Sequence, residues 1–436
     1  MDEFWLTIVF LFTLFFLLGT GVWVGLALLG VALVGMELFT TRPAGDAMIT
    51  TIWTSSSSWA LTALPLFIWM GEILFRTRLS EDMFNGLAPW MARLPGRLLH
   101  TNIVGCTVFA AVSGSSAATV TTIGKMSIPE LRRRGYPEHM IIGTLAGAGT
   151  LGLMIPPSLT LIVYGVTINE SISKLFIAGI LPGIVLASFF MGYVAIWSLV
   201  NRDAVPPEPV LPLREKIARA RHLLPVLMLV AGVLGSIYFG FATATEAASF
   251  GVVGALLLAA SQGALTRQAF AESLMGAVRT SAMIALILMG AAFLALAMGF
   301  TGLPRALAEW IAGMQLSPTA LIAALTVFYI VLGCFLDGIS SVVLTMAVVE
   351  PMIRAAGIDT IWFGIFIVVV VEMAQITPPI GFNLFVLQGM SGHEINYIAR
   401  VSIPFFLLMV LMVVVLVAFP ELATFLPETM RQAPGG

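Results

Sequence analysis

Two short polar runs interrupt long apolar stretches of the sequence and could bind an ion. The runs are Ser113-Gly114-Ser115-Ser116 and Asp337-Gly338-Ile339-Ser340-Ser341. Hydroxyl oxygens are hard donors that can replace part of the hydration shell of Na⁺. Irregular backbone at mid-membrane depth is tolerated only inside protein or beside a water-filled cavity. We therefore predict two re-entrant helical hairpins, over 97–128 and 317–353, with these runs at their tips. The alternative is two ordinary spanning helices with Ser/Gly packing faces.

A Pro-Pro pair follows each of these stretches and predicts a broken helix. Pro156-Pro157 interrupts the apolar segment 136–166, and Pro378-Pro379 interrupts 359–389. Each pair removes two backbone donors, so preceding carbonyl oxygens lose their intrahelical partners. That loss is costly in hydrocarbon but supplies ligands beside a bound cation. The side-chain oxygens of Thr377 and Asn383 lie close in sequence to the second break.

The hairpin tips also suit an anionic substrate. The second half of each hairpin begins at its tip, so its helix N-terminus points into the protein centre. Unpaired N–H groups and the positive end of the helix dipole favour a carboxylate there. We predict that substrate binds near the tips, at Ser113, Gly114, Asp337, Gly338, Ser340 and Asn383.

These features recur in order, which indicates an internal repeat. Pro129 and Arg132 lie in a Pro-x-x-Arg-x-x-Gly motif that ends 21 residues before Pro156, and Pro351 and Arg354 lie in the same motif before Pro378. The offset between the two motifs and between the two Pro-Pro pairs is 222 residues. Counted along the chain, the first broken helix runs outward and the second inward. Inverted repeats with discontinuous helices are typical of secondary transporters.

The composition requires a bilayer as solvent for this chain. Its 436 residues are 59% hydrophobic and 10% charged, whereas soluble domains are about 45–50% apolar and 25% charged. We predict an all-α integral membrane protein with about ten full crossings plus the two hairpins. The predicted crossings are 4–20, 22–39, 60–76, 136–166, 174–200, 222–240, 245–262, 270–301, 359–389 and 396–426.

The domain organisation follows from the repeat. We predict scaffold helices and an interfacial arm in 1–59, a first transport repeat in 60–200, a cytoplasmic linker in 201–221, and further scaffold helices in 222–263. The second transport repeat covers 264–427, and 428–436 form a tail.

Basic residues predict the orientation, because cytoplasmic loops collect Lys and Arg. If the basic linker 201–221 is cytoplasmic, most basic residues fall on that side. The far side then receives Arg42, Lys174, Arg305, Arg354 and Arg431. Both termini are expected on this far side.

Five acidic residues lie in the membrane stretches, where an ionisable group is functional by default. Asp337 adjoins a hairpin tip, Glu372 precedes Thr377 by one to two turns, and Glu246 lies near an interface. Glu72 and Glu350 are interpreted as structural, because Arg76 and Arg354 follow each of them by four residues.

The residue pattern disfavours other classes. The two cysteines and four histidines form no disulfide framework and no metal-ligand spacing. The chain contains neither His-Glu-x-x-His nor Gly-x-Ser-x-Gly, so a membrane-embedded enzyme is a remote alternative. A channel is also remote, because paired broken helices argue against an open pore.

These motifs together resemble the large membrane subunit of the TRAP (tripartite ATP-independent periplasmic) transporters, which belong to the ion-transporter superfamily. The resemblance covers about residues 1–427. It is carried by Ser113-Gly-Ser-Ser-Ala-Ala-Thr119, Pro129-Glu-Leu-x-x-x-Gly135-Tyr, Gly152-x-x-Ile155-Pro-Pro-Ser158, Thr245-Glu246-Ala-Ala and Thr377-Pro-Pro-x-Gly381-x-Asn383.

The resemblance implies a permease subunit of the bacterial inner membrane that moves substrate by an elevator motion. It implies coupling to Na⁺ and no other cofactor. The implied partners are a small four-helix membrane subunit, a periplasmic substrate-binding protein and a small organic acid such as a dicarboxylate, with no nucleic acid. The implied cation ligands are Ser115, Ser116, Gly149, Pro156, Ser158, Ser341, Thr345, Thr377 and Pro379. A single-component Na⁺/carboxylate symporter is the nearest alternative.

Overall fold

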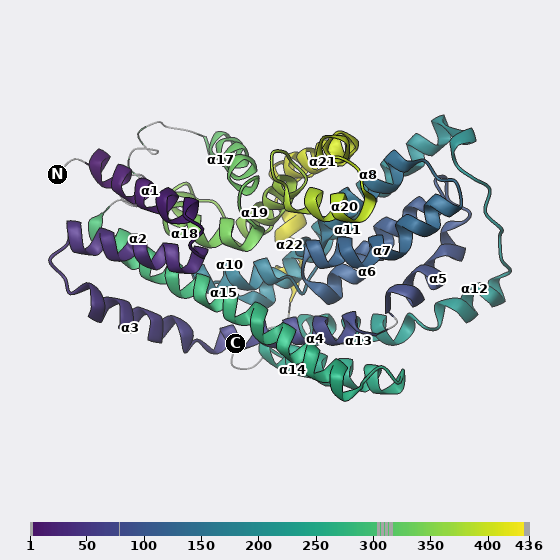
Figure 1. Ribbon diagram of the computed structural model, residues 1–436, viewed down its shortest axis with the longest axis horizontal. Coiled ribbons are helices and arrows are strands. Elements are labelled where there is room, and N and C mark those ends of the chain that lie inside the picture. Colours follow the sequence, from purple (N-terminus) through teal and green to yellow (C-terminus); the bar gives the residue numbers. More distant parts are fainter. Residues whose placement is uncertain are drawn as a thin grey trace.

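The computed structural model describes residues 3–77, 79–302 and 317–430, with 306, 309 and 313 between them. These residues form helices joined by short connections and contain no strand (Figure 1). Three basic residues of the predicted charge distribution lie outside the described residues: Arg78, Arg305 and Arg431. The all-helical fold class is therefore confirmed for the described part of the chain.

The first layer of helices combines the predicted scaffold segments 1–59 and 222–263 with α4 and α15, which lie in the predicted transport repeats. Its members are α1 (Glu3–Gly19), α2 (Val24–Phe39), α3 (Ala44–Ser56), η1 (Trp59–Thr62), α4 (Ala63–Phe75), α13 (Leu224–Tyr238), α14 (Ala244–Ser261) and the long α15 (Arg267–Thr301). Helix α15 runs along α2, α3 and α4. It approaches α2 closely because Gly25 and Gly290 lack side chains. A Cβ on Gly290 would lie 2.5 Å from the Gly25 carbonyl oxygen, and small residues are how membrane helices reach such contact.

The second group of helices contains the rest of the two predicted repeats. The first repeat has α5 (Leu79–Met91), α6 (Leu99–Ser113), α7 (Ser116–Arg133), α8 (Glu138–Gly149), α9 (Leu151–Met154), α10 (Leu159–Ile168) and α11 (Ile172–Val200). The second has α17 (Pro318–Gly333), α18 (Gly338–Ala355), α19 (Thr360–Gln375), α20 (Phe382–Ser391), α21 (Ile395–Ala418) and α22 (Glu421–Thr429). Two helix pairs and two broken helices therefore lie where the sequence predicted hairpins and breaks.

The second half of each hairpin begins at a side-chain cap. Ser115 Oγ accepts from the Ala118 N–H at the start of α7. Asp337 Oδ2 accepts from the N–H groups of Ile339 and Ser340 at the start of α18. Such caps satisfy amides that a helix end leaves without partners.

Three predicted boundaries differ from the structure. Helix α7 continues through Pro129 to Arg133, and α18 through Pro351 to Ala355, so both hairpins are longer than predicted. The predicted crossing 396–426 is two helices, because α21 ends at Ala418 and α22 begins after Pro420. Proline disfavours helical geometry in the residue before it, which ends α21 there.

Among the described residues, six helices are long and apolar enough to cross a membrane, or up to eight if each of two bent pairs counts as one span. Helix length and composition therefore do not reproduce the predicted count of ten full crossings. Several predicted crossings, including α1, α2 and α19, form helices of only 16 or 17 residues.

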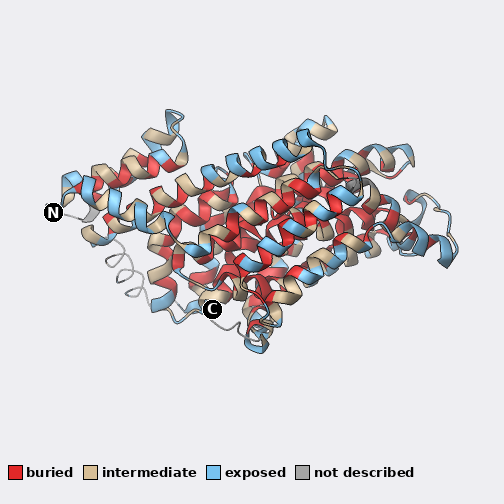
Figure 2. Cartoon of the chain, turned by 90° about the horizontal axis from the view of Figure 1, so that it is seen from below, coloured by how far each residue is buried: buried red, intermediate tan, exposed pale blue. Residues whose placement is uncertain are grey.

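The interior along the helices is buried, and the outer faces are exposed (Figure 2). Those faces carry large apolar side chains such as Phe12, Phe241 and Leu257, as expected for contact with lipid.

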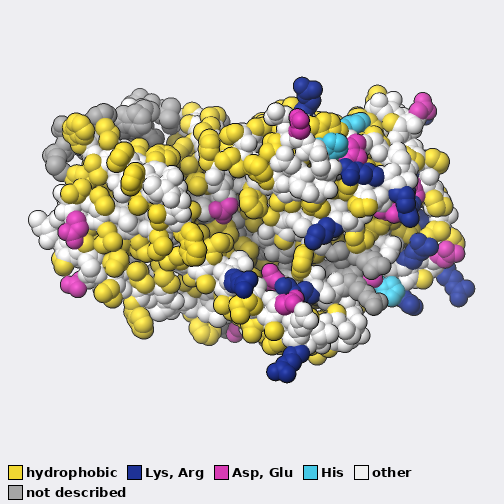
Figure 3. Space-filling view, in the orientation of Figure 1, with side chains coloured by type: hydrophobic (Ala, Val, Ile, Leu, Met, Phe, Trp, Pro, Cys, Tyr) yellow, Lys and Arg dark blue, Asp and Glu magenta, His cyan; other side chains and the backbone are white. Residues whose placement is uncertain are grey.

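Charge is distributed unevenly over the molecule. In the view of Figure 3, most Lys and Arg side chains gather over the half that contains α5, α7, α8 and α12 (Leu213–Ala220), while the other half is mainly hydrophobic. The structure contains no membrane, so the assignment of this half to the cytoplasm stays a prediction.

The linker 201–221 is docked on the base of the first hairpin. Arg97 donates to the carbonyl oxygens of Val205, at 3.0 Å, and Pro206. Arg134 forms an ion pair with Glu208, and the Tyr136 hydroxyl donates to the same carboxylate at 3.2 Å. These contacts hold an otherwise irregular segment in place.

Glu208→Gln is expected to release this linker, because it removes the charge that Arg134 and Tyr136 share. Limited trypsinolysis in detergent should then cleave at Arg202 or Arg214 several times faster than in the wild type, since local opening exposes cleavage sites. Glu215→Gln, at an exposed position of the same linker, is the matched control and should cleave at the wild-type rate. Equal rates for all three proteins would contradict a docked linker.

Candidate ion and substrate site

The tip of the first hairpin meets the first helix break. Gly114 adopts a left-handed conformation (φ +58°) between α6 and α7, and its carbonyl oxygen accepts from the Leu159 N–H just after Pro156-Pro157. Gly152, before the break, lies against the hairpin backbone. A Cβ on Gly152 would be 2.5 Å from the Cα of Ser116 and 2.6 Å from the carbonyl oxygen of Ser115. The hairpin tip and the break therefore form one unit.

The second hairpin and break repeat this arrangement. The Gly381 N–H, just after Pro378-Pro379, donates to the Cys334 carbonyl oxygen at the end of α17. The Gln375 side chain donates to the carbonyl oxygen of Leu336 at the tip. Leu159 and Gly381 are separated by the 222 residues of the predicted offset. The repeated contact indicates that the offset reflects a repeated three-dimensional unit. Both Pro-Pro bonds are cis.

The two repeats are interlocked. Helix α10, after the first break, packs on α18 of the second hairpin, and α20, after the second break, packs on α7 of the first. Gly338 of α18 lies near Thr160 of α10, and Gly149 at the end of α8 lies near Asn383 of α20. Each half-helix therefore supports the hairpin of the other repeat.

Several predicted site residues are buried polar groups without a partner among the described residues. Ser340 and Ser341 lie in the first turn of α18, and their hydroxyls have no hydrogen bond. The Asn383 amide, at the start of α20, is fully buried and unpaired at both its oxygen and its nitrogen. A buried polar group without a partner costs about 1–3 kcal/mol. These groups are therefore suited to a ligand or an ion.

Other predicted residues are occupied by internal hydrogen bonds. Ser113 Oγ lies 2.8 Å from Thr119 Oγ1 across the first tip. Ser158 caps α10 by accepting from the Leu161 N–H. Thr345 contacts the Tyr329 hydroxyl at 2.7 Å and donates to the Ser341 carbonyl oxygen, and Thr377 donates to the carbonyl oxygen of Met373. Ser158 accepts one bond and Thr377 only donates, so both hydroxyl oxygens keep a free lone pair.

The two halves of the site differ in exposure. Pro156 is buried, whereas Pro379 and its neighbours are exposed. Helix α6 packs closely along α7, but α17 packs mainly on α19 and touches α18 less. The second hairpin is therefore splayed and its break accessible, while the first is closed.

The acidic residues separate into distinct roles. Glu72 pairs with Arg76, and Glu350 pairs with Arg354 at 2.7 Å, as predicted. Glu246 is a structural cap rather than a site residue, since it closes a capping box with Thr243 at the start of α14. Glu372 is buried on α19 with both carboxylate oxygens unpaired.

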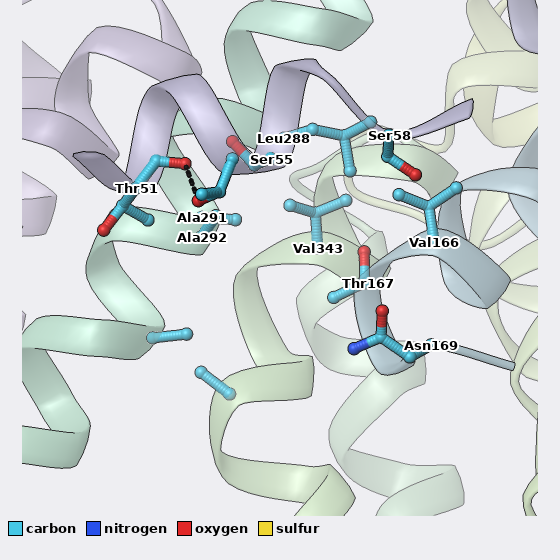
Figure 4. Close-up of a pocket in the computed structure, with 13 residues that line it drawn as sticks. Thr51, Ser55, Ser58, Val166, Thr167, Asn169, Leu288, Ala291, Ala292 and Val343 are labelled. Atoms are coloured by element: carbon cyan, nitrogen blue, oxygen red, sulfur yellow. Dashed lines mark hydrogen bonds between the residues drawn. The ribbon is translucent and has the colours of Figure 1, made fainter. Parts of the chain in front are cut away.

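A polar cavity of about 300 Å³ lies between the scaffold layer and the repeats (Figure 4). Its scaffold wall includes residues of α15 and hydroxyl residues of α3 and the segment before η1, and its other wall comes from α10 and α18. The lining residues include Thr51, Ser55, Ser58, Thr167, Asn169, Ala291 and Val343. None of the described residues that line the cavity is charged, so its walls can hydrogen-bond a small solute without a fixed charge.

The sequence reasoning missed some of these polar residues. Thr160, buried and unpaired, follows the Pro-Pro break by three residues, and its place in a Ser-x-Thr pattern was the available signal. The Ser/Thr-rich run before residue 59 was interpreted as an interfacial arm, but its hydroxyls line the cavity. Their partners on α10 and α18 are far away in sequence, so no local pattern could have indicated the cavity.

Comparison with known proteins identifies relatives over most of the chain. The family model described as "Tripartite ATP-independent periplasmic transporter, DctM component" matches residues 11–422. The C4-dicarboxylate TRAP transporter large permease protein of Pseudomonas aeruginosa is 30% identical, covering 86% of this chain and 88% of the relative. The ectoine TRAP transporter large permease protein of Halomonas elongata is 29% identical, covering 85% and 86%.

Two further matches extend this picture. An isethionate TRAP transporter permease protein of Oleidesulfovibrio alaskensis is 30% identical over 95% of this chain but only 65% of its own length. The solved structure of the YdaH transporter of Alcanivorax borkumensis has a similar fold, with a TM-score of 0.68 at 13% identity, covering 92% of this chain and 98% of that chain.

Proposed function

Because the chain belongs to the DctM family of large permease subunits of tripartite ATP-independent periplasmic transporters, we propose that it translocates a small organic acid by Na⁺-coupled secondary transport. Its relatives are named for dicarboxylate, ectoine, isethionate and sialic acid, so family membership leaves the substrate class open. The organic acid is our proposal.

The repeated unit of hairpin tip and helix break is the main support for ion coupling. In each repeat a carbonyl oxygen where the first hairpin helix ends accepts from the N–H of the second residue after the Pro-Pro pair. Buried hydroxyl and amide groups without partners lie beside these units. Oxygen-rich, buried and irregular backbone at a helix break is typical of Na⁺ sites in secondary transporters. The proposed ligands are the hydroxyls and carbonyls of the two tips and breaks.

Sodium coupling supplies the free energy in this proposal. Each Na⁺ that moves inward gains about 2.3 kcal/mol per 100 mV of membrane potential. Two or three ions could support strong accumulation of substrate without ATP. A cation that binds best when the tips are closed shifts the protein toward that conformation, and this differential affinity is the coupling.

The movement proposed is an elevator, in which the two interlocked repeats slide as one body against the scaffold layer. The polar cavity supports this division, because it separates α3 from α10 and α18. We place the protein in the bacterial inner membrane with both termini periplasmic. Its proposed partners are a small four-helix membrane subunit and a periplasmic substrate-binding protein.

The purified chain in detergent should melt at a higher temperature in NaCl than in KCl at equal ionic strength. Ligand binding stabilises the folded state by about 2.7 kcal/mol at a hundredfold excess over Kd. Replacing Ser115 and Ser341 together with alanine should remove most of this Na⁺-specific rise, because one hydroxyl is lost from each tip. Equal melting of the wild type in both salts would refute sodium coupling by this chain.

A further inference from the structure

Glu372 is a buried carboxyl group that the proposed hairpin sites do not use. It lies in the last turn of α19, in a stretch buried from Trp362 to Gln375. Its exposure is 1%, and neither carboxylate oxygen has a hydrogen-bond partner among the described residues. Burying a charged carboxylate is very unfavourable unless an opposite charge accompanies it. A buried carboxyl group therefore either stays protonated or has a positively charged group beside it.

No basic side chain supplies that group within the described part of the chain. The Ser116 hydroxyl, at the start of α7, lies close enough to influence the Glu372 carboxyl group, although the two do not form a hydrogen bond of normal geometry. On the helices packed against α19, Tyr164 donates to the Thr360 carbonyl oxygen, Tyr329 contacts Thr345, and Glu350 pairs with Arg354. None of the other titratable groups on these helices hydrogen-bonds Glu372 in the described part of the chain: Lys174, Tyr193, Tyr397, Arg400, Glu421 and Glu428.

The carboxyl group occurs in one repeat only. The 222-residue offset places Thr150 at the corresponding position of the first repeat, and its hydroxyl donates to the Gly147 carbonyl oxygen at 2.6 Å. The threonine is thus satisfied within its own helix, whereas Glu372 faces the hairpin of the other repeat. Helix geometry therefore does not require an acid here.

We propose that Glu372 and Ser116 together hold a coupling Na⁺ at the contact between α19 and the tip of the first hairpin. The inference rests on the proposed sodium coupling and adds a charged ligand to it. Two carboxylate oxygens and a hydroxyl oxygen are the hard donors that Na⁺ requires, and the ion supplies the missing charge. Because Ser116 belongs to the first repeat and Glu372 to the second, this ion ties the two repeats together.

This bridging position gives the ion a specific effect on the protein. The first hairpin is closed on its break in the structure, with Gly152 against Ser116. An ion between Ser116 and Glu372 stabilises that closed arrangement. Its loss leaves a buried carboxylate beside the tip, which favours separation of α19 from α7. We therefore expect Na⁺ to protect the first hairpin more than the splayed second one.

The test is a double-mutant cycle on the Na⁺-specific thermal shift of the full-length chain, measured in NaCl against KCl. Glu372→Gln keeps the size and removes the charge, and Ser116→Ala removes the hydroxyl. Each should reduce the Na⁺-specific rise by more than half. The double variant should lose no more of the Na⁺-specific rise than the more damaging single variant does. The effects of two residues that bind the same ion are not additive.

Two further variants make the test specific. Ser341 lies in the other hairpin and is proposed to bind a separate ion. Combining Ser341→Ala with Glu372→Gln should therefore reduce the Na⁺-specific rise by the sum of the two single reductions. Glu350→Gln, the same substitution at a carboxylate paired with Arg354 on α18, should leave the rise unchanged. A full rise in Glu372→Gln would overturn this inference and indicate a neutral, protonated acid, while leaving sodium coupling intact.

A fold defect in Glu372→Gln does not block the test, because Glu372→Asp retains the charge and moves the oxygens by one methylene. The Na⁺ concentration at half-maximal stabilisation should rise at least tenfold in this variant. An unchanged half-maximal concentration overturns the proposal. The absence of any Na⁺-specific rise in the wild type would refute the proposed function itself, so the two failures are distinguishable.

Discussion

Replacing Gly152 with alanine is expected to abolish most of the Na⁺-specific stabilisation and to lower the melting temperature in both salts. The added Cβ would lie 2.5 Å from the Ser116 Cα, 2.6 Å from the Ser116 nitrogen and 2.6 Å from the Ser115 carbonyl oxygen. All three are backbone atoms, so no side-chain rotation can relieve the contact. Overpacking of this kind costs about 1–3 kcal/mol, and here the hairpin tip itself must move.

Gly192→Ala is the matched control for this experiment. Gly192 lies inside α11, and nothing lies within 4 Å of its Cβ position. Alanine is a better helix former than glycine by about 1 kcal/mol, so this variant should melt at or above the wild-type temperature with a normal Na⁺ response. An unaltered Na⁺ response in Gly152→Ala would contradict the contact between the first tip and its break.

Phe405→Ala is expected to destabilise the protein by about 3–5 kcal/mol, which is the usual cost of removing a buried aromatic ring. The ring fills the space above two glycines of α8, Gly143 and Gly147. It also packs edge-to-face on Phe190 at 5.4 Å and Tyr193 at 5.3 Å between ring centroids. In a bilayer the loss comes mainly from packing, because lipid is as apolar as the helix interface.

The measurement for this variant is thermal denaturation in KCl, where no coupling ion contributes. Leu407→Ala, on the same helix but at an exposed position, is the control and should stay within about 0.5 kcal/mol of the wild type. If both variants melt alike, α21 does not pack on α8 as the structure shows.

The sequence predicted the parts of this fold that depend on local pattern. Apolar length indicated the helices, and the Pro-Pro pairs marked both breaks because proline cannot donate within a helix. The polar runs located both hairpin tips, and the 222-residue offset located the equivalent contacts of Leu159 and Gly381. Each of these features is encoded within a few neighbouring residues.

The parts that depend on packing between distant segments could not be predicted. Nothing near α17 indicates that it packs on α19 more than on its hairpin partner α18. Glu246 and Glu372 are both acids in apolar stretches, yet one caps a helix and the other is unpaired. The difference depends on whether a backbone N–H or a distant hairpin lies nearby. The roles of the predicted cation ligands stay predictions until the ion experiments are performed.

The interlocked repeats have a consequence for how the chain is made. Helix α10 emerges from synthesis long before α18, the helix on which it packs, and α7 long before α20. The first hairpin therefore cannot reach its final environment until nearly the whole polypeptide is inserted. A fragment that ends in the linker would keep its spans but lack the supports for its own tip, so neither half could serve as an independent module.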